Sequence, residues 1–169
     1  MRTYLVAFPA FAAADRERIA AIRERHDRLA AKLSPHVTLV LATDVLDPSG
    51  LARHAASIDR PAPFACVFRR TRVEHDPFSD EFCVFLVPDE GAREIRELHD
   101  ALYTGPLAGE LRTDLPYHPH VTIARCATEA DARAVAASLG KVEIVTRIEH
   151  LHVLAAADTT FVSADAIAL

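Results

Sequence analysis

The chain has 169 residues, half of them hydrophobic and a quarter charged, with a formal net charge of −5 at pH 7. This length suits one domain, or two small lobes packed closely together, with a sizeable hydrophobic core. The negative charge argues against a broad basic surface for long duplex nucleic acid, but it allows a small substrate that carries a phosphate.

The cysteines and the apolar segments indicate a cytoplasmic protein. The three cysteines are odd in number and show no CxxC spacing, so we expect free, buried thiols in a reducing compartment. No apolar run is long enough to span a bilayer, and Pro9 interrupts the apolar start of the chain, so we expect neither a signal peptide nor a membrane partner. We expect a monomer.

The first half of the chain alternates predicted strands and helices. Residues 3–8 are predicted to form a strand, and residues 12–33 a long amphipathic helix with apolar residues at helical spacing. Ser34-Pro35 ends this helix, because a residue before proline avoids the α region. A strand follows directly, then a helix to about residue 58. Residues 64–75 and 81–87 are predicted to form a hairpin.

The second half repeats this alternation. We expect a helix at 90–103, an irregular loop at 104–117 and a strand at 118–125. Thr128 is expected to cap a helix that Gly140 closes. Residues 141–155 and 161–169 are predicted to be the last two strands, turned around residues 157–159.

One motif, Pro-His-Val-Thr, occurs twice, at 35–38 and 119–122, and its histidines are 84 positions apart. Residues two apart on a strand share a face, so His36 and Thr38 are expected to point one way while Val37 and Leu39 enter the core. The same alternation pairs His120 with Thr122. A titratable ring beside a hydroxyl, repeated on two buried strands, is a candidate active site.

A second likeness supports an internal duplication. Thr-Arg-Val-Glu-His at 71–75 resembles Thr-Arg-Ile-Glu-His at 146–150, although a chance match is the alternative. We predict a single domain, residues 1–169, with an internal repeat at approximately 35–87 and 119–169. Two similar units would pack most simply about a pseudo-twofold axis, so that the two Pro-His-Val-Thr strands face each other across a cleft.

Two histidines that converge on one substrate can supply a base and an acid. With an unperturbed pKa near 6.5, one imidazole can be neutral while the other is protonated. The threonine hydroxyls and a nearby arginine could donate to phosphoryl oxygens and stabilise the negative charge that develops. This set suits attack on a phosphodiester, and the scheme requires no metal or other cofactor.

The duplicated His-x-Thr pattern resembles the 2H phosphoesterase superfamily, and within it the bacterial 2′-5′ RNA ligase/cyclic phosphodiesterase-like proteins. The family pattern is His, hydrophobic, Thr or Ser, hydrophobic, twice. His36-Val37-Thr38-Leu39 and His120-Val121-Thr122-Ile123 both match it.

The resemblance implies a bilobal α+β fold, with antiparallel sheets that line a central cleft and helices outside. It implies metal-independent hydrolysis of a 2′,3′-cyclic phosphate or a related cyclic or 2′-5′ phosphodiester, on a small molecule or an RNA end. His36 and His120 would be acid and base, and Thr38 and Thr122 would orient the phosphate. Some relatives carry a basic residue where Arg125 stands, but strict alternation puts Arg125 on the face opposite His120.

Two other functions fit the same residues. A non-catalytic nucleotide or RNA-end binding module could keep the cleft without turnover. A metal-dependent hydrolase could use His118 with His120, or His150 with His152, since each pair shares a strand face. The residues do not distinguish hydrolysis from the reverse, ligase-direction reaction, nor the base from the acid.

Overall fold

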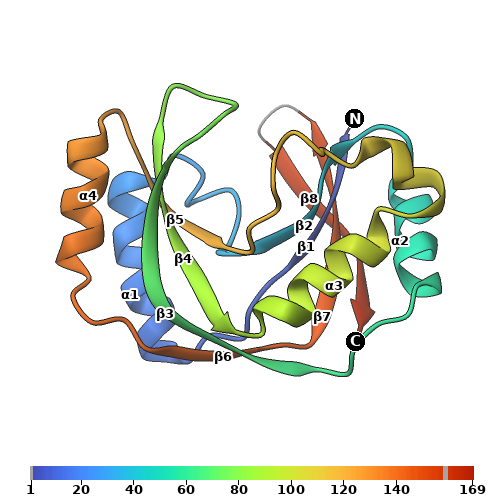
Figure 1. Ribbon diagram of the computed structural model, residues 1–169, viewed down its shortest axis with the longest axis horizontal. Helices are drawn as coiled ribbons and strands as arrows, with labels where there is room; N and C mark the ends of the chain where they lie inside the picture. Colours follow the sequence, from blue (N-terminus) through green and yellow to red (C-terminus); the bar gives the residue numbers. More distant parts are fainter. Residues whose placement is uncertain (1, 158–159) are drawn as a thin grey trace.

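The computed structural model describes residues 2–157 and 160–169, which build two antiparallel four-stranded sheets with helices around them (Figure 1). In sheet A the order is β2 (Val37–Thr43), β1 (Arg2–Ala7), β7 (His150–Ala157) and β8 (Thr160–Ala168). In sheet B it is β5 (Val121–Cys126), β4 (Phe82–Glu90), β3 (Phe64–His75) and β6 (Ile144–Ile148). This confirms the bilobal α+β fold. Residues 158 and 159 of the predicted last turn lie outside the described residues.

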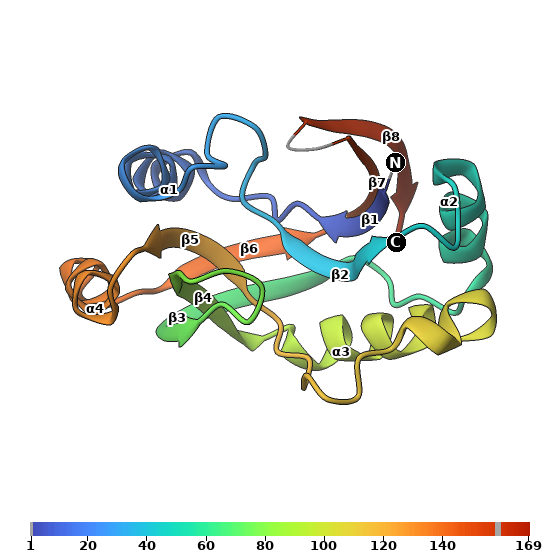
Figure 2. The same ribbon diagram turned by 90° about the horizontal axis from the view of Figure 1, so that it is seen from above.

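In the described residues, four α-helices and a 3₁₀ helix cover the sheets: α1 (Ala13–His26), α2 (Pro48–Ser57), α3 (Ala92–Leu102), η1 (Gly105–Glu110) and α4 (Glu129–Ser138). α4 packs on sheet B and α2 on sheet A, at opposite ends of the molecule (Figures 1 and 2). α3 contacts β2 and β4, one strand of each sheet, and α1 contacts β5.

The first helix is shorter than the expected 12–33, because α1 ends at His26. The next residue, Asp27, is extended (φ −130°, ψ 108°). Its Oδ1 accepts a hydrogen bond from the Leu29 N–H at 3.0 Å, and its Oδ2 accepts one from Arg23 Nε at 2.9 Å. The aspartate side chain thus bonds to the backbone two residues on, which favours a turn over further helix.

The prediction of a single strand at 141–155 is also wrong. This segment forms two strands, because the chain passes from one sheet to the other at Glu149. β6 pairs with β3, with Thr146 opposite Cys66, whereas β7 pairs with β1, with His152 opposite Val6. β6 alternates buried and exposed residues, β7 alternates except at Val153 and Leu154, which are both buried, and no glycine or proline separates the two strands. The segment therefore crosses from one lobe to the other without a breaker in the sequence.

Each Pro-His-Val-Thr strand has an extra residue, relative to its neighbour, just after the threonine of the motif, and β2 has a second one nearer its end. In sheet A, Thr38 lies opposite Val6 but Val40 lies opposite Leu5. In sheet B, Thr122 lies opposite Phe85 and Ala124 opposite Val84. A β-bulge of this kind switches the faces of the residues that follow it.

The two sheets correspond strand by strand, with β2 and β5 at the edge and β1 and β4 next to them. The similar stretches 71–75 and 146–150 do not occupy equivalent places in the two sheets. Thr71 lies opposite Leu86 of β4, whereas Thr146 belongs to the same sheet and lies opposite Cys66 of β3. The repeat boundaries 35–87 and 119–169 stay a prediction.

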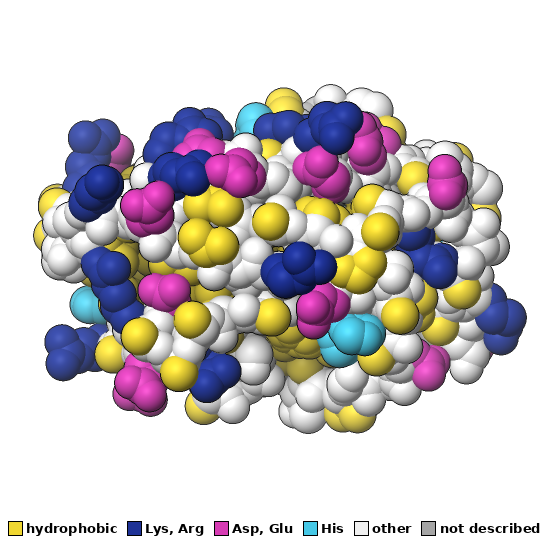
Figure 3. Space-filling model, turned by 90° about the horizontal axis from the view of Figure 1, so that it is seen from below, with side chains coloured by type: hydrophobic (Ala, Val, Ile, Leu, Met, Phe, Trp, Pro, Cys, Tyr) yellow, Lys and Arg dark blue, Asp and Glu magenta, His cyan; other side chains and the backbone are white. Residues whose placement is uncertain are grey.

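The surface seen in Figure 3 carries basic and acidic side chains next to one another, with hydrophobic side chains between them. This face offers no broad basic field. The cysteines at 66, 83 and 126 are free and buried, as expected. In the described part of the chain, no helix is both long and apolar enough to cross a membrane.

Candidate active site

The imidazoles of His36 and His120 are held in the same way. Nδ1 of His36 lies 2.8 Å from the carbonyl oxygen of Ser34, and Nδ1 of His120 lies 2.7 Å from that of His118. A carbonyl oxygen can only accept, so Nδ1 carries the proton in both rings. When neutral, each ring therefore presents an unprotonated Nε2, the atom that can take or give a proton.

A phenylalanine packs against each imidazole. Phe85 of β4 stacks on His120, with ring centroids 3.9 Å apart and an interplanar angle of 27°. Phe8 meets His36 edge-on, with centroids 6.2 Å apart. Together with the Nδ1 bonds, these contacts fix the orientation of both rings. The contact of Phe85 was not predicted, because its side of the hairpin depends on the register of β4 with β5.

The structure brings the two motifs together. β2 and β5 begin beside each other in the middle of the molecule (Figures 1 and 2). The Tyr117 hydroxyl donates a hydrogen bond of 2.8 Å to the carbonyl oxygen of Thr38, which ties the segment before His120 to the strand after His36. A positive charge on His120 also lowers the pKa of His36, so the two rings lie within electrostatic reach of each other.

Burial and nearby cations make His36 a weak base. Burial lowers the pKa of His36 to about 4, while the bond to the Ser34 carbonyl opposes this change. Positive charges on Arg23, His120 and Arg125 lower the pKa further. His36 is therefore neutral near pH 7.

His120 differs from His36 in one neighbour. Burial lowers the pKa of His120, and the bond to the His118 carbonyl raises it. The carboxylate of Glu74 on β3 also raises the pKa of His120, whereas no carboxylate acts on His36 in the same way. Of the two rings, His120 has the surroundings better suited to a proton.

Thr38 and Thr122 are half-buried, on the same strand faces as the two histidines. Within residues 2–157 and 160–169, neither hydroxyl has a hydrogen-bond partner. Both hydroxyls can therefore donate to a ligand that lies against the two rings.

Arg125 lies on the face of β5 that carries His120, because the bulge between Thr122 and Ala124 switches the alternation. The expectation from strict alternation was wrong for this reason. The Arg125 side chain is 18% exposed, with Nη1 3.2 Å from Asp76 Oδ2 and Nε 3.5 Å from Asp27 Oδ1. Its positive charge lowers the pKa of both His36 and His120.

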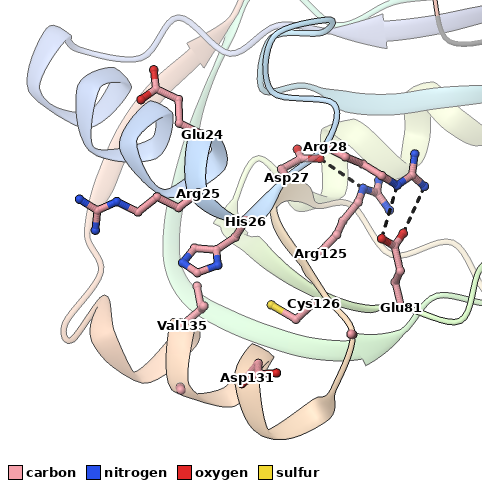
Figure 4. Close-up of a pocket in the computed structure, with 12 residues that line it drawn as sticks. Glu24, Arg25, His26, Asp27, Arg28, Glu81, Arg125, Cys126, Asp131 and Val135 are labelled. Atoms are coloured by element: carbon pink, nitrogen blue, oxygen red, sulfur yellow. Dashed lines mark hydrogen bonds and ion pairs between the residues drawn. The ribbon is translucent and has the colours of Figure 1, made fainter.

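Arg125 also borders a cavity of about 630 Å³ between α1 and α4 (Figure 4). Its guanidinium meets Asp27 there, and Arg28 forms a two-pronged pair with Glu81. Arg28 with Glu81 and Arg125 with Asp27 thus form two ion pairs in this cavity, and no phenylalanine or tyrosine lines it.

The buried pair Arg23–Asp27 is a part of the site that sequence reasoning missed. The side chains are only 4% and 2% exposed, and Asp27 is shared between Arg23 and Arg125. A basic and an acidic residue four apart on a charged helix look like an ordinary surface pair. Nothing in the local sequence separates the two cases.

The histidine pairs considered for a metal do not gather further ligands. Among the residues that the structure describes, no group of three His, Cys, Asp or Glu side chains is arranged to hold a metal ion. His118 is exposed, and it is its backbone carbonyl that supports His120.

A family model described as the 2′-5′ RNA ligase superfamily matches residues 10–160. No curated protein gives a significant sequence match. Among solved structures, Escherichia coli LigT complexed with 3′-AMP is similar at a TM-score of 0.65 and 19% identity, over 99% of this chain and 97% of that one. The same protein complexed with ATP is similar at a TM-score of 0.63 and 20% identity, over 99% of this chain and 97% of that one.

Kluyveromyces marxianus Usb1 with uridine monophosphate is similar at a TM-score of 0.58 and 10% identity, over 99% of this chain and 98% of that one. These likenesses, at low identity, concern the fold.

Proposed function

Because the chain belongs to the 2′-5′ RNA ligase superfamily, we propose that it is a metal-independent phosphodiesterase that acts on a 2′,3′-cyclic phosphate or a related cyclic or 2′-5′ phosphodiester. One observation carries this proposal: the two imidazoles share one anchoring pattern, with Nδ1 bound to a carbonyl and Nε2 left for chemistry. The substrate is a nucleotide or an RNA end.

In the proposed reaction, Nε2 of neutral His36 takes a proton from water as the water oxygen attacks phosphorus. Protonated His120 gives the proton on Nε2 to the ribose oxygen whose bond to phosphorus breaks. One P–O bond forms and one breaks, and a phosphomonoester with a free hydroxyl results. One proton enters at His36 and one leaves at His120, so solvent exchange restores the enzyme.

The roles follow from the surroundings of the rings. Burial disfavours a positive charge on His36, and Arg23, which does not act on His120 in this way, adds to the effect, so His36 suits the base. Glu74 favours a positive charge on His120, so His120 suits the acid. Thr38 and Thr122 would donate to the two non-bridging oxygens of the phosphate, and Arg125 would stabilise the negative charge that develops there.

Turnover with matched variants tests the proposal. Wild type, His36→Ala and His120→Ala would be assayed on 2′,3′-cyclic nucleotides, 2′-5′ dinucleotides and RNA ending in a 2′,3′-cyclic phosphate, with and without EDTA. Each single variant should lose roughly 10²–10⁴-fold in kcat. Nucleotide binding without turnover would favour the binding module, and activity lost with EDTA would favour the metal-dependent hydrolase.

A further inference from the structure

The guanidinium of Arg125 is held by two carboxylates that come from different parts of the chain. Its Nε lies 3.5 Å from Oδ1 of Asp27, which directly follows α1, as Figure 4 shows. Its Nη1 lies 3.2 Å from Oδ2 of Asp76, which directly follows β3, and 3.4 Å from the sulfur of Cys83. In the described part of the chain, Nη2 has no partner.

Each of these carboxylates is also held by other donors. The Asp27 side chain is 2% exposed and accepts from Arg23 Nε at 2.9 Å as well as from the backbone N–H two residues on. Asp76 accepts from the N–H of Phe78 at 2.9 Å and from the hydroxyl of Ser79 at 3.0 Å. Neither carboxylate therefore depends on Arg125 for its orientation.

Two fixed anions on one guanidinium restrict a side chain that would otherwise rotate freely. A long side chain loses conformational entropy when it becomes ordered around a ligand, and ordering it beforehand removes this cost from binding. Arg125 lies on the strand face that carries His120, and its charge acts on both imidazoles. The amino group that the carboxylates leave free is thus available to a phosphate that meets the two rings.

We infer that Asp27 and Asp76 are positioning residues, which fix Nε and Nη1 of Arg125 and direct Nη2 to the phosphate. This inference rests on the proposed function and identifies the groups that hold its cation in place. It can be distinguished from simple charge neutralisation. Carboxylates that only neutralised Arg125 would weaken catalysis, so their removal would increase activity, whereas the loss of positioning residues decreases it.

The chain offers matched variants for both carboxylates. Asp27→Asn and Asp76→Asn each remove one charge at nearly constant size. Glu24→Gln is the control on α1, and Asp80→Asn is the control in the loop after β3, since both residues are exposed and, among the described residues, neither pairs with Arg125. Arg125→Leu, alone and combined with each Asp→Asn change, completes two double-mutant cycles.

The first readout is kcat/KM on a 2′,3′-cyclic nucleotide. Asp27→Asn and Asp76→Asn should each lower it roughly tenfold, mainly through kcat, because small displacements of groups that act in the transition state are costly. Both control variants should match wild type. In the Arg125→Leu background, the same Asp→Asn changes should cost nothing further, since no guanidinium is left to position.

Losses that multiply in the double variants would show a merely structural role and would overturn the inference. Activity that rises when a carboxylate is removed would overturn it as well. The amide of Asp27→Asn would face Nε of Arg23, a donor against a donor, and can prevent folding. In that case the cycle of Asp76 with Arg125 decides.

The second readout is the dissociation constant of adenosine 3′-monophosphate, measured by calorimetry on the same variants. Each Asp→Asn change should weaken binding roughly 2- to 10-fold, the cost of ordering one long side chain, and only where Arg125 is present. This binding pattern without turnover in wild type would remove the phosphodiesterase and keep the positioning residues. Turnover without this pattern in either readout would do the opposite.

Discussion

Leu41 and Arg125 occupy equivalent positions in the two sheets: each lies three residues after the threonine of its motif and just past the extra residue that follows this threonine. Both side chains return to the face that carries the histidines. Leu41 is apolar and 40% exposed, whereas Arg125 is charged and tied to Asp27 and Asp76. The two halves of the site thus agree in the histidines and threonines and differ at this position.

Replacing Arg125 should therefore weaken catalysis, and replacing Leu41 should not. Arg125→Leu removes the charge proposed to act on the phosphate and should lower kcat/KM on the order of 10²-fold. Arg125→Lys keeps the charge and should recover part of that loss. Leu41→Ala should change kcat/KM by less than about twofold, since Leu41 offers no donor. Equal losses at the two positions would contradict the proposed role of Arg125.

The two histidines should respond differently to the leaving group. A p-nitrophenyl phosphodiester releases an anion that needs no proton, so His120→Ala should regain much of its activity on this substrate. His36→Ala should remain roughly 10²–10⁴-fold slower than wild type on both substrates, because it lacks the base. Rescue of His36→Ala instead of His120→Ala would reverse the assigned roles.

The pH dependence of kcat/KM reports the histidines of the free enzyme. The base must be deprotonated, which requires a pH above the His36 pKa of about 4. The acid must be protonated, and burial lowers the pKa of His120 from its ordinary value. We expect a bell-shaped profile with its maximum below about pH 6.5. A maximum well above neutral pH would contradict these surroundings.

The same pKa change should make the protein less stable in acid. An unfolded histidine binds a proton as the pH falls below about 6.5, whereas folded His36 does so only near pH 4. Between these values the unfolded state binds more protons than the folded state. The free energy of unfolding therefore decreases as the pH is lowered, and it levels off below about pH 4. His36 contributes up to roughly 3 kcal/mol to this loss of unfolding free energy. The free energy of unfolding, measured with urea at several pH values, should fall less in His36→Gln than in wild type as the pH is lowered. The same pH dependence in both proteins would contradict this account.

The hydrogen bond from Tyr117 to Thr38 should matter for alignment of the site. Tyr117→Phe removes a partly buried hydrogen bond between the two motif segments and should cost about 0.5–1.5 kcal/mol in unfolding free energy. It should also lower kcat roughly tenfold, because small displacements of reacting groups are costly.

Tyr103→Phe is the matched control for this bond. The Tyr103 hydroxyl accepts a hydrogen bond of 3.1 Å from the N–H of Leu41, which is on the same strand as Thr38. This bond does not connect the two motifs. Its loss should reduce stability by a similar amount and leave kcat near that of wild type. If both variants lose kcat equally, the bond of Tyr117 has no special part in alignment.

Much of the fold could be predicted because its signals are local. The strands at 64–75 and 161–169 and the helix capped by Thr128 agree closely with β3, β8 and α4. The end of α1 was missed because Asp27 acts through its own side-chain bonds, which periodicity does not register. The change of sheet at Glu149 was missed because both strands are rich in apolar residues and no glycine or proline lies between them.

The site could be predicted only as far as the motifs reach. The repeated His-x-Thr marks His36 and His120, and the bonds to residues two positions earlier are local as well. Phe85 and Arg23 come to the site through tertiary packing, so their sequence neighbourhood carries no sign of it. The strand face of Arg125 depends on a β-bulge, which the alternation of residues in the sequence does not reveal.

The division of the strands between the sheets has a consequence for synthesis of the protein on the ribosome. Sheet B uses one continuous stretch, from β3 to β6, whereas sheet A joins β1 and β2 to the last two strands, β7 and β8. The lobe of His120 can therefore form while the chain is still growing, since domains fold as their strands emerge. The lobe of His36 waits for the final strands. A chain cut short before residue 150 carries both motifs and lacks two of the four strands that hold one of them.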